Sequence, residues 1–149
     1  MSELAELEAR IKVLEDIEAL KKLKAKYWRC IDKKLWDEIV DCFVEDAAAD
    51  YGPNMQFQGR KAIVQFLKDS LGRDSIITAH NGHNAEIEIT SDTTARGIWA
   101  LNDQVVIQPN TRRRGWGHYE DEYIKEKGKW EIKNTKITSI LAEWMMSER

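Results

Sequence analysis

The chain has 149 residues and a net charge of −3, and the 33% of its residues that are charged carry both signs. This balance offers none of the basic surface needed to bind nucleic-acid phosphates, so nucleic acid is not an expected partner. The length predicts a single domain over residues 1–149, with a core large enough to enclose a pocket.

The two cysteines and the N-terminus indicate the compartment of the protein and whether it binds a metal or a membrane. Cys30 and Cys42 lie in apolar stretches without the paired spacing of a metal site, so we expect free, buried thiols in a reducing compartment and no metal or other cofactor. The N-terminus is acidic and helix-forming, unlike a secretory signal, and no apolar run reaches membrane-spanning length. These features predict a cytoplasmic protein that does not bind membranes.

Residues 4–33 contain no Gly or Pro and are rich in strong helix formers, which predicts the first and longest helix. Apolar residues recur along it at spacings of three and four, from Leu4 to Ile31, so one face must be covered. Up to about residue 15 this stripe has no local partner. We therefore predict that residues 1–13 form a helical extension that packs on a second subunit in a homo-oligomer, a dimer or a trimer. Asp16 is a plausible N-cap for the part that follows.

Shorter elements follow in the first half of the chain. Residues 35–43 predict a second helix, residues 46–51 and 55–58 a short hairpin, and residues 60–71 a third helix, which Gly72 ends.

From residue 76 onward the apolar period changes to two, which indicates strands. Residues 76–89 and 93–107 predict a long hairpin, followed by a loop at 108–111 and two further strands that meet at Lys127-Gly128. Helices followed by strands predict an α+β fold with a curved antiparallel sheet. Such a sheet wrapped over a helix leaves a cone-shaped apolar space where a small ligand binds.

Asp103 is the unusual residue of its strand, because its neighbours on the same face are small or apolar. It is predicted to point into the interior, where an unpaired carboxylate is costly. His80 lies at a comparable distance from the hairpin turn, within cross-strand reach. A buried His80–Asp103 pair would fix the imidazole tautomer and make a general base. On the residues alone, an exposed Asp103 with His80 as a polar surface residue stays open.

Tyr27 and Asp32 form a second candidate pair near the end of the first helix. A Tyr hydroxyl in the pocket would donate to a substrate oxygen, with Asp32 nearby to orient it. The alternative is a core Tyr and a helix-capping Asp. His83 competes with His80 for the pocket, because a bulge beside Gly82 would turn either one inward, whereas His118 is predicted to lie on the surface.

Several signatures of other enzyme classes are missing. The sequence has no G-x-S-x-G elbow, no phosphate-cradling Gly-rich loop and no G-x-G-x-x-G motif. The Arg112–Arg114 run is predicted to be solvated, with contact to an anionic substrate group at the pocket mouth as the alternative.

Taken together, the order of short motifs resembles the SnoaL-like branch of the nuclear transport factor 2-like superfamily. The motifs that carry the resemblance are Asp16-Ile17-Glu18-Ala19-Leu20, Tyr27, Asp32, Phe43-Val44-Glu45-Asp46-Ala47, Gly59-Arg60-Lys61-Ala62-Ile63, His80, Asn84, Gly117-His118-Tyr119 and Gly128-Lys129-Trp130-Glu131-Ile132. The resemblance implies a cone-shaped α+β fold, also called cystatin-like, with an enclosed pocket.

Within this branch the chain is most similar to dehydratases of polycyclic substrates, bile acid 7α-dehydratase and, more remotely, scytalone dehydratase. The resemblance implies a catalytic set of Tyr27, Asp32, His80 and Asp103, and its register favours His80 over His83. Members often carry an Arg on the last strand near Thr138, which this chain lacks, so an anionic bile acid conjugate is not implied.

The expected function is that of a cofactor-independent lyase, a dehydratase, acting on a hydrophobic polycyclic or aromatic hydroxy-ketone. The alternatives are an isomerase or polyketide-type cyclase with the same site, and a non-catalytic module that binds small molecules or assembles subunits. The expected partner is a small hydrophobic or aromatic molecule. The residues expected to contact it are Trp28, Phe66, Asn84, Trp99, Trp116 and Tyr119.

Overall fold

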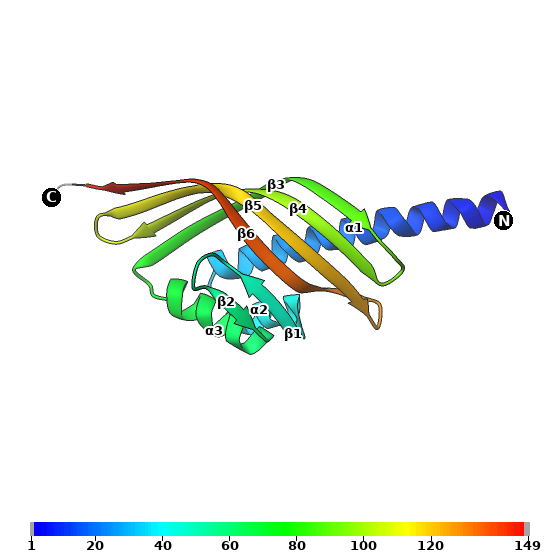
Figure 1. Cartoon of the computed structure of the whole chain (residues 1–149), viewed down its shortest axis with the longest axis horizontal. Coiled ribbons are helices and arrows are strands. Elements are labelled where there is room, and N and C mark those ends of the chain that lie inside the picture. The colour runs from blue at the N-terminus through cyan, green and yellow to red at the C-terminus, as the bar shows by residue number, and fades with distance from the viewer. Residues whose placement is uncertain (1, 148–149) are drawn as a thin grey trace.

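The computed structural model, which describes residues 2–147, consists of a long helix beneath a curved six-stranded sheet, with smaller elements at one side (Figure 1). The helices are α1 (Glu3–Asp32), α2 (Trp36–Ile39) and α3 (Arg60–Leu71), with a 3₁₀ turn, η1 (Val40–Cys42). The strands are β1 (Phe43–Asp50), β2 (Gln56–Gln58), β3 (Ile76–Ile89), β4 (Thr94–Ile107), β5 (Thr111–Glu126) and β6 (Lys129–Met146).

Helix α1 is continuous over 30 residues, and Ser2 caps it by accepting a hydrogen bond from the Ala5 amide at 3.2 Å. The prediction that Asp16 begins a separate helical part is wrong. Asp16 lies inside the helix, buried, and its Oδ1 accepts hydrogen bonds from Lys125 Nζ and Trp130 Nε1, each at 2.8 Å. Its carboxylate therefore ties the helix to the sheet instead of capping a helix end.

The two halves of α1 have different surroundings. The second half packs under the sheet and buries Leu20, Leu23, Tyr27 and Trp28 among other residues. The first turns extend beyond the sheet (Figure 1), and their apolar stripe stays exposed, with Leu4 at 66% and Leu14 at 65%. Among residues 2–147, no helix combines the length and apolar character that crossing a membrane requires.

The sheet has the strand order β2-β1-β6-β5-β4-β3, and every pairing is antiparallel except that of β1 with β6, which is parallel. The prediction of an α+β fold with a curved sheet is confirmed, and the parallel pairing makes the sheet mixed. The predicted hairpin has the expected register, with His80 directly opposite Asp103. β5 begins at Thr111, so the Arg112–Arg114 run lies in this strand, and Arg113, which was predicted to be solvated, is only 26% exposed.

The predicted second helix was too long. The helical part ends at Ile39, the 3₁₀ turn follows, and Phe43 already begins β1 by pairing with Ile132. Buried residues at 39, 42 and 43 fit both a helical stripe and a turn that enters a strand, which explains the error. Both cysteines are free and buried, as predicted, and burial raises the pKa of the Cys42 thiol to about 12.

Candidate active site

His80 lies in β3 on the face turned towards α1, and its side chain is only 7% exposed. Its Nδ1 lies 2.7 Å from Asp32 Oδ1, and its backbone amide donates to Asp32 Oδ2 at 2.9 Å. Thr78 Oγ1 adds a third hydrogen bond to Asp32 Oδ1 at 2.8 Å. Since the carboxylate accepts the Nδ1 proton, Nε2 carries the lone pair, as a general base requires.

The predicted role of Asp103 as the partner of His80 is therefore wrong, although the two residues are neighbours in the sheet. Asp103 is bound instead by Arg113, whose Nη1 lies 2.9 Å from Oδ1 and 3.1 Å from Oδ2. A permanently charged guanidinium is a stronger partner for a carboxylate than a neutral imidazole. Asp32 is free to hold His80 because α1 ends beside β3.

Tyr27 is completely buried, and its hydroxyl lies 2.9 Å from the hydroxyl of Tyr51. It makes no hydrogen bond with Asp32, whose described side-chain hydrogen bonds all lead to β3, so the expected Tyr27–Asp32 pairing is not found. Burial raises the pKa of both tyrosines, which keeps both hydroxyls protonated and able to donate. Of the two tyrosines, Tyr51 lines a hollow described below and Tyr27 does not.

Two hollows lie next to these groups. One, of about 660 Å³, is lined by Tyr51, Leu101, Asp103, Arg113 and Trp116 among others. The other, of about 710 Å³, lies between α1 and β3. Its lining includes Trp28, Asp32, His80 and Trp99. Because His80 and Asp103 face each other across the β3–β4 pair, the two hollows are neighbours.

Aromatic rings form the apolar wall. Trp28 packs edge-on against Trp99 at 5.3 Å and against Tyr119 at 5.6 Å. Gly82 is required opposite Trp28, because an added Cβ would lie 1.8 Å from the indole Cη2. Trp28, Trp99 and Trp116 therefore line the hollows as expected, whereas Tyr119 lies buried behind them.

Two other residues that were expected to contact the ligand, Phe66 and Asn84, do not line these hollows. Phe66 stacks on Phe57 at 4.2 Å and on Tyr51 at 5.7 Å, so it supports Tyr51 from behind. Asn84 is exposed at a bulge in β3 with a φ of 51° and lines neither hollow, so its position does not support the expected contact with the ligand. The bulge reverses the side-chain alternation after His83, which turns Asn84 outward.

The remaining histidines, His83 and His118, are both exposed. His83 also lines the hollow beside α1, but its side chain is exposed, whereas that of His80 is nearly buried. His118 is exposed, as predicted for its strand face.

A buried ion pair behind the aromatic wall was missed by the sequence analysis. Lys24 Nζ lies 2.8 Å from Asp121 Oδ2, and both side chains are fully buried. Burial lowers the pKa of Lys24, and the Asp121 charge opposes that change. The ammonium also lies over three rings, at 4.0 Å from Tyr119, 4.5 Å from Tyr27 and 4.8 Å from Trp28. Lys24 sits four residues after Leu20 and three before Tyr27, which is the signal that places it on the buried stripe.

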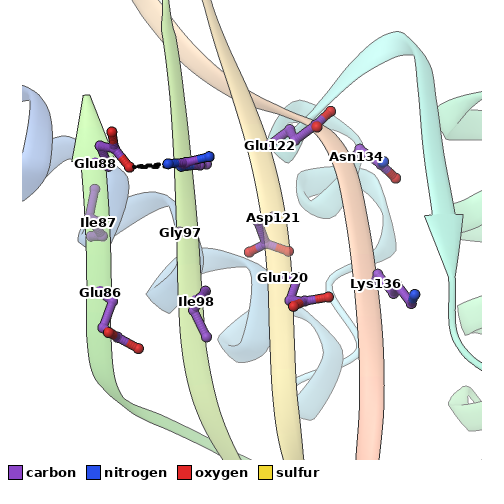
Figure 2. A pocket seen from close by; sticks show the side chains of 11 residues that line it. Glu86, Ile87, Glu88, Gly97, Ile98, Glu120, Asp121, Glu122, Asn134 and Lys136 are labelled. Carbon is purple, nitrogen blue, oxygen red and sulfur yellow. Dashed lines mark hydrogen bonds and ion pairs between the residues drawn. The ribbon is translucent and has the colours of Figure 1, made fainter. Parts of the chain in front are cut away.

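A third hollow, of about 600 Å³, lies on the outer face of the sheet. Figure 2 shows Glu86 and Glu88 on β3, Glu120 and Glu122 on β5, and Lys136 on β6 around it. Its lining contains no His or Tyr, and its four glutamates are all exposed, unlike the nearly buried His80. Within residues 2–147 no three His, Cys, Asp or Glu side chains converge as a metal site needs. We therefore place the candidate active site on the inner face.

This arrangement, a helix under a curved sheet with a His–Asp pair at their contact, coincides with a family match. Residues 12–136 match the family described as a SnoaL-like domain. The chain belongs to the SnoaL-like domain family. The match covers both partners of the His80–Asp32 pair and Tyr51, so these polar groups of the candidate site lie inside the SnoaL-like region.

Solved structures share the fold of this SnoaL-like domain. A proposed scytalone dehydratase from Novosphingobium aromaticivorans superimposes with a TM-score of 0.83 at 23% identity, over 94% of this chain and 93% of that one. A hexachlorocyclohexane dehydrochlorinase from Novosphingobium barchaimii gives 0.83 at 15% identity, over 94% and 97%. A nuclear transport factor 2-like protein with a cystatin-like fold, from N. aromaticivorans, gives 0.77 at 19% identity, over 94% and 92%.

Proposed function

We propose that this SnoaL-like domain is a cofactor-independent lyase, a dehydratase, that acts on a hydrophobic polycyclic or aromatic hydroxy-ketone. The observation that carries the proposal is the His80–Asp32 pair, at 2.7 Å, in a nearly buried position beside an aromatic-lined hollow. An imidazole held in one tautomer by a carboxylate, with its second nitrogen unprotonated, is suited to removing a proton from carbon.

The reaction that fits these groups is an elimination of water. His80 Nε2 takes the proton from the carbon next to the substrate carbonyl, and Asp32 stabilises the imidazolium that forms. The bond between the neighbouring carbon and its hydroxyl then breaks, the imidazolium gives its proton to the departing oxygen, and water is released. General acid–base assistance of this kind accelerates a reaction by about 10²- to 10⁴-fold for each group.

Tyr51 has a different task in this scheme. Burial raises the pKa of its hydroxyl, so it holds a substrate oxygen by donating a hydrogen bond and keeps its own proton. Tyr27 positions Tyr51 through the contact between their hydroxyls. The names dehydratase and dehydrochlorinase, borne by two proteins of similar fold, denote eliminations, which accords with this proposal.

The mass of the product tests the proposed reaction. Incubating the purified chain with a panel of aromatic and fused-ring β-hydroxy ketones is expected to give, for at least one of them, a product lighter by one water in mass spectrometry. A product of unchanged mass would replace the dehydratase by an isomerase or cyclase. No turnover of any β-hydroxy ketone, with tight binding of the same compounds, would indicate a binding module instead.

We also propose that the chain assembles with copies of itself. The projecting part of α1 exposes Leu4, Leu7, Ile11 and Leu14, and the end of β6 exposes another apolar group. That group consists of Ile140, Leu141, Trp144, Met145 and Met146. Large exposed apolar side chains gathered in this way mark contact surfaces between proteins.

Light scattering of the purified chain measures this assembly. We expect a mass of two or three chains for the wild type and a smaller mass when Leu7 and Ile11 are both changed to Ser, because the apolar stripe then loses its central residues. Glu8→Ser is the matched control on the same helix and is expected to leave the mass unchanged. A monomeric wild type at micromolar concentration would contradict the proposal.

A further inference from the structure

The pair formed by Arg113 and Asp103 has no place in the proposed proton transfer. Arg113 is 26% exposed and Asp103 13%, and both line the 660 Å³ hollow that Tyr51 also lines. Asp103 faces His80 on one side and Gly115 on the other in the sheet register. The ion pair therefore lies on the floor of the candidate site, next to the base.

The chain leaves room for this pair at Gly115. A Cβ added there would lie 2.2 Å from Asp103 Oδ1 and 2.8 Å from each of the Arg113 Nη atoms. A side chain at position 115 would displace the ion pair. Because Gly115 has none, the guanidinium can lie close to the sheet. The guanidinium is thus held by the carboxylate of Asp103, in space that the missing side chain of Gly115 leaves open.

Most of the donors of Arg113 stay available to a ligand. Both contacts with Asp103 use Nη1, at 2.9 and 3.1 Å, and neither Nη2 nor Nε donates to any residue in 2–147. A guanidinium carries five N–H donors in a planar fork, so several of them remain for a ligand in the hollow.

The net charge of the Arg113–Asp103 pair determines which kind of ligand these donors bind best. Asp103 cancels the charge of Arg113, so a carboxylate ligand would gain from the guanidinium and lose a similar amount against Asp103. A neutral carbonyl oxygen accepts the same hydrogen bonds without that repulsion. Hydrogen bonds to an oxygen also strengthen when negative charge develops on it, as it does in an enolate.

We propose that the Arg113–Asp103 pair is the carbonyl-binding group of the site, and that it selects neutral aromatic ketones over aromatic carboxylates. The inference deepens the proposed function and rests on it for the identity of the reacting substrate. Asp103 lies beside His80 in the sheet and binds Arg113, so a substrate whose carbonyl is held by Arg113 can extend towards His80. Arg113 then stabilises the enolate that His80 creates.

A binding experiment with two matched probes tests the selection. The neutral 2-acetylnaphthalene and the anionic 2-naphthoate share a ring system and are titrated into the full chain at neutral pH by calorimetry. The wild type is expected to prefer the ketone. Asp103→Asn leaves the guanidinium uncompensated, so the ratio of the two dissociation constants is expected to move about tenfold or more towards the carboxylate.

A second variant keeps the test decisive if Asp103→Asn folds poorly. Arg113→Met removes the donors and retains the aliphatic stem, and we expect it to weaken ketone binding about tenfold. Arg112→Met, whose side chain is exposed on the adjacent position of β5, is the matched control and should bind both probes as the wild type does. An unchanged probe ratio in Asp103→Asn, or unchanged ketone binding in Arg113→Met, would overturn the inference.

The test separates this inference from the proposed function because it measures binding and not turnover. An unchanged probe ratio together with a water-loss product refutes the role of Arg113 and leaves the dehydratase standing. A shifted ratio without any turnover refutes the dehydratase and retains Arg113 as a ketone-selecting residue.

Discussion

Replacing His80 with Ala is expected to lower the turnover of a β-hydroxy ketone by about 10²- to 10⁴-fold, because the proposed general base is removed. Ligand binding should remain, since the aromatic wall is formed by Trp28 and Trp99 and does not depend on the imidazole. Initial rates, together with calorimetric binding of 2-acetylnaphthalene, measure the two effects separately.

His83→Ala is the matched control, because His83 lies on the same strand and is exposed at the rim. It should retain the wild-type rate. Asp32→Asn should reduce kcat in the same direction as His80→Ala, since the amide no longer stabilises the imidazolium. Wild-type turnover in the His80→Ala variant would exclude the mechanism.

Replacing Asp121 with Ala is expected to lower the free energy of unfolding by about 3–5 kcal/mol, as is typical when one partner of a buried ion pair is removed. The change leaves the buried ammonium of Lys24 without its counter-ion, and it leaves the hydroxyls of Thr135 and Tyr123 without an acceptor at 2.6 and 2.7 Å. Urea unfolding followed by tryptophan fluorescence measures the loss.

Glu120→Ala is the control for this variant. Glu120 is the preceding residue of β5, exposed on the outer face, and its loss is expected to change stability by no more than about 0.5 kcal/mol. Equal unfolding midpoints for Asp121→Ala and Glu120→Ala would show that the buried pair contributes little to stability.

The parts of the fold that the sequence predicted well are those decided by local pattern. Residues 4–33 contain no helix breaker, and the structure has one helix over Glu3–Asp32. Residues 76–107 alternate around a short polar turn, and the resulting register places His80 opposite Asp103 as expected. Local periodicity therefore predicts which residues face inward and which are cross-strand neighbours.

The contacts within the site depend on how the elements pack, which local pattern does not contain. Asp32 and His80 are 48 residues apart, and they meet because the end of α1 lies against β3. Tyr51 follows a strand of small residues, and nothing in the sequence indicates that its hydroxyl lies beside that of Tyr27. In the sequence, Lys24 resembles many other charged residues that favour helices. Its burial depends on the ion pair with Asp121, which lies 97 positions later in the chain.

Helix α1 has a consequence for how the pair of His80 and Asp32 is maintained. Its 30 residues span about 45 Å at 1.5 Å per residue, and Asp32 is the last of them. The helix is held against the sheet by Asp16 and Lys24, whose polar partners lie on β5 and β6 and not on β3, the strand of His80. These contacts fix the axial position and rotation of a stiff rod, so the position of Asp32 beside His80 is set by anchors about two turns (Lys24) and about four turns (Asp16) earlier in the helix.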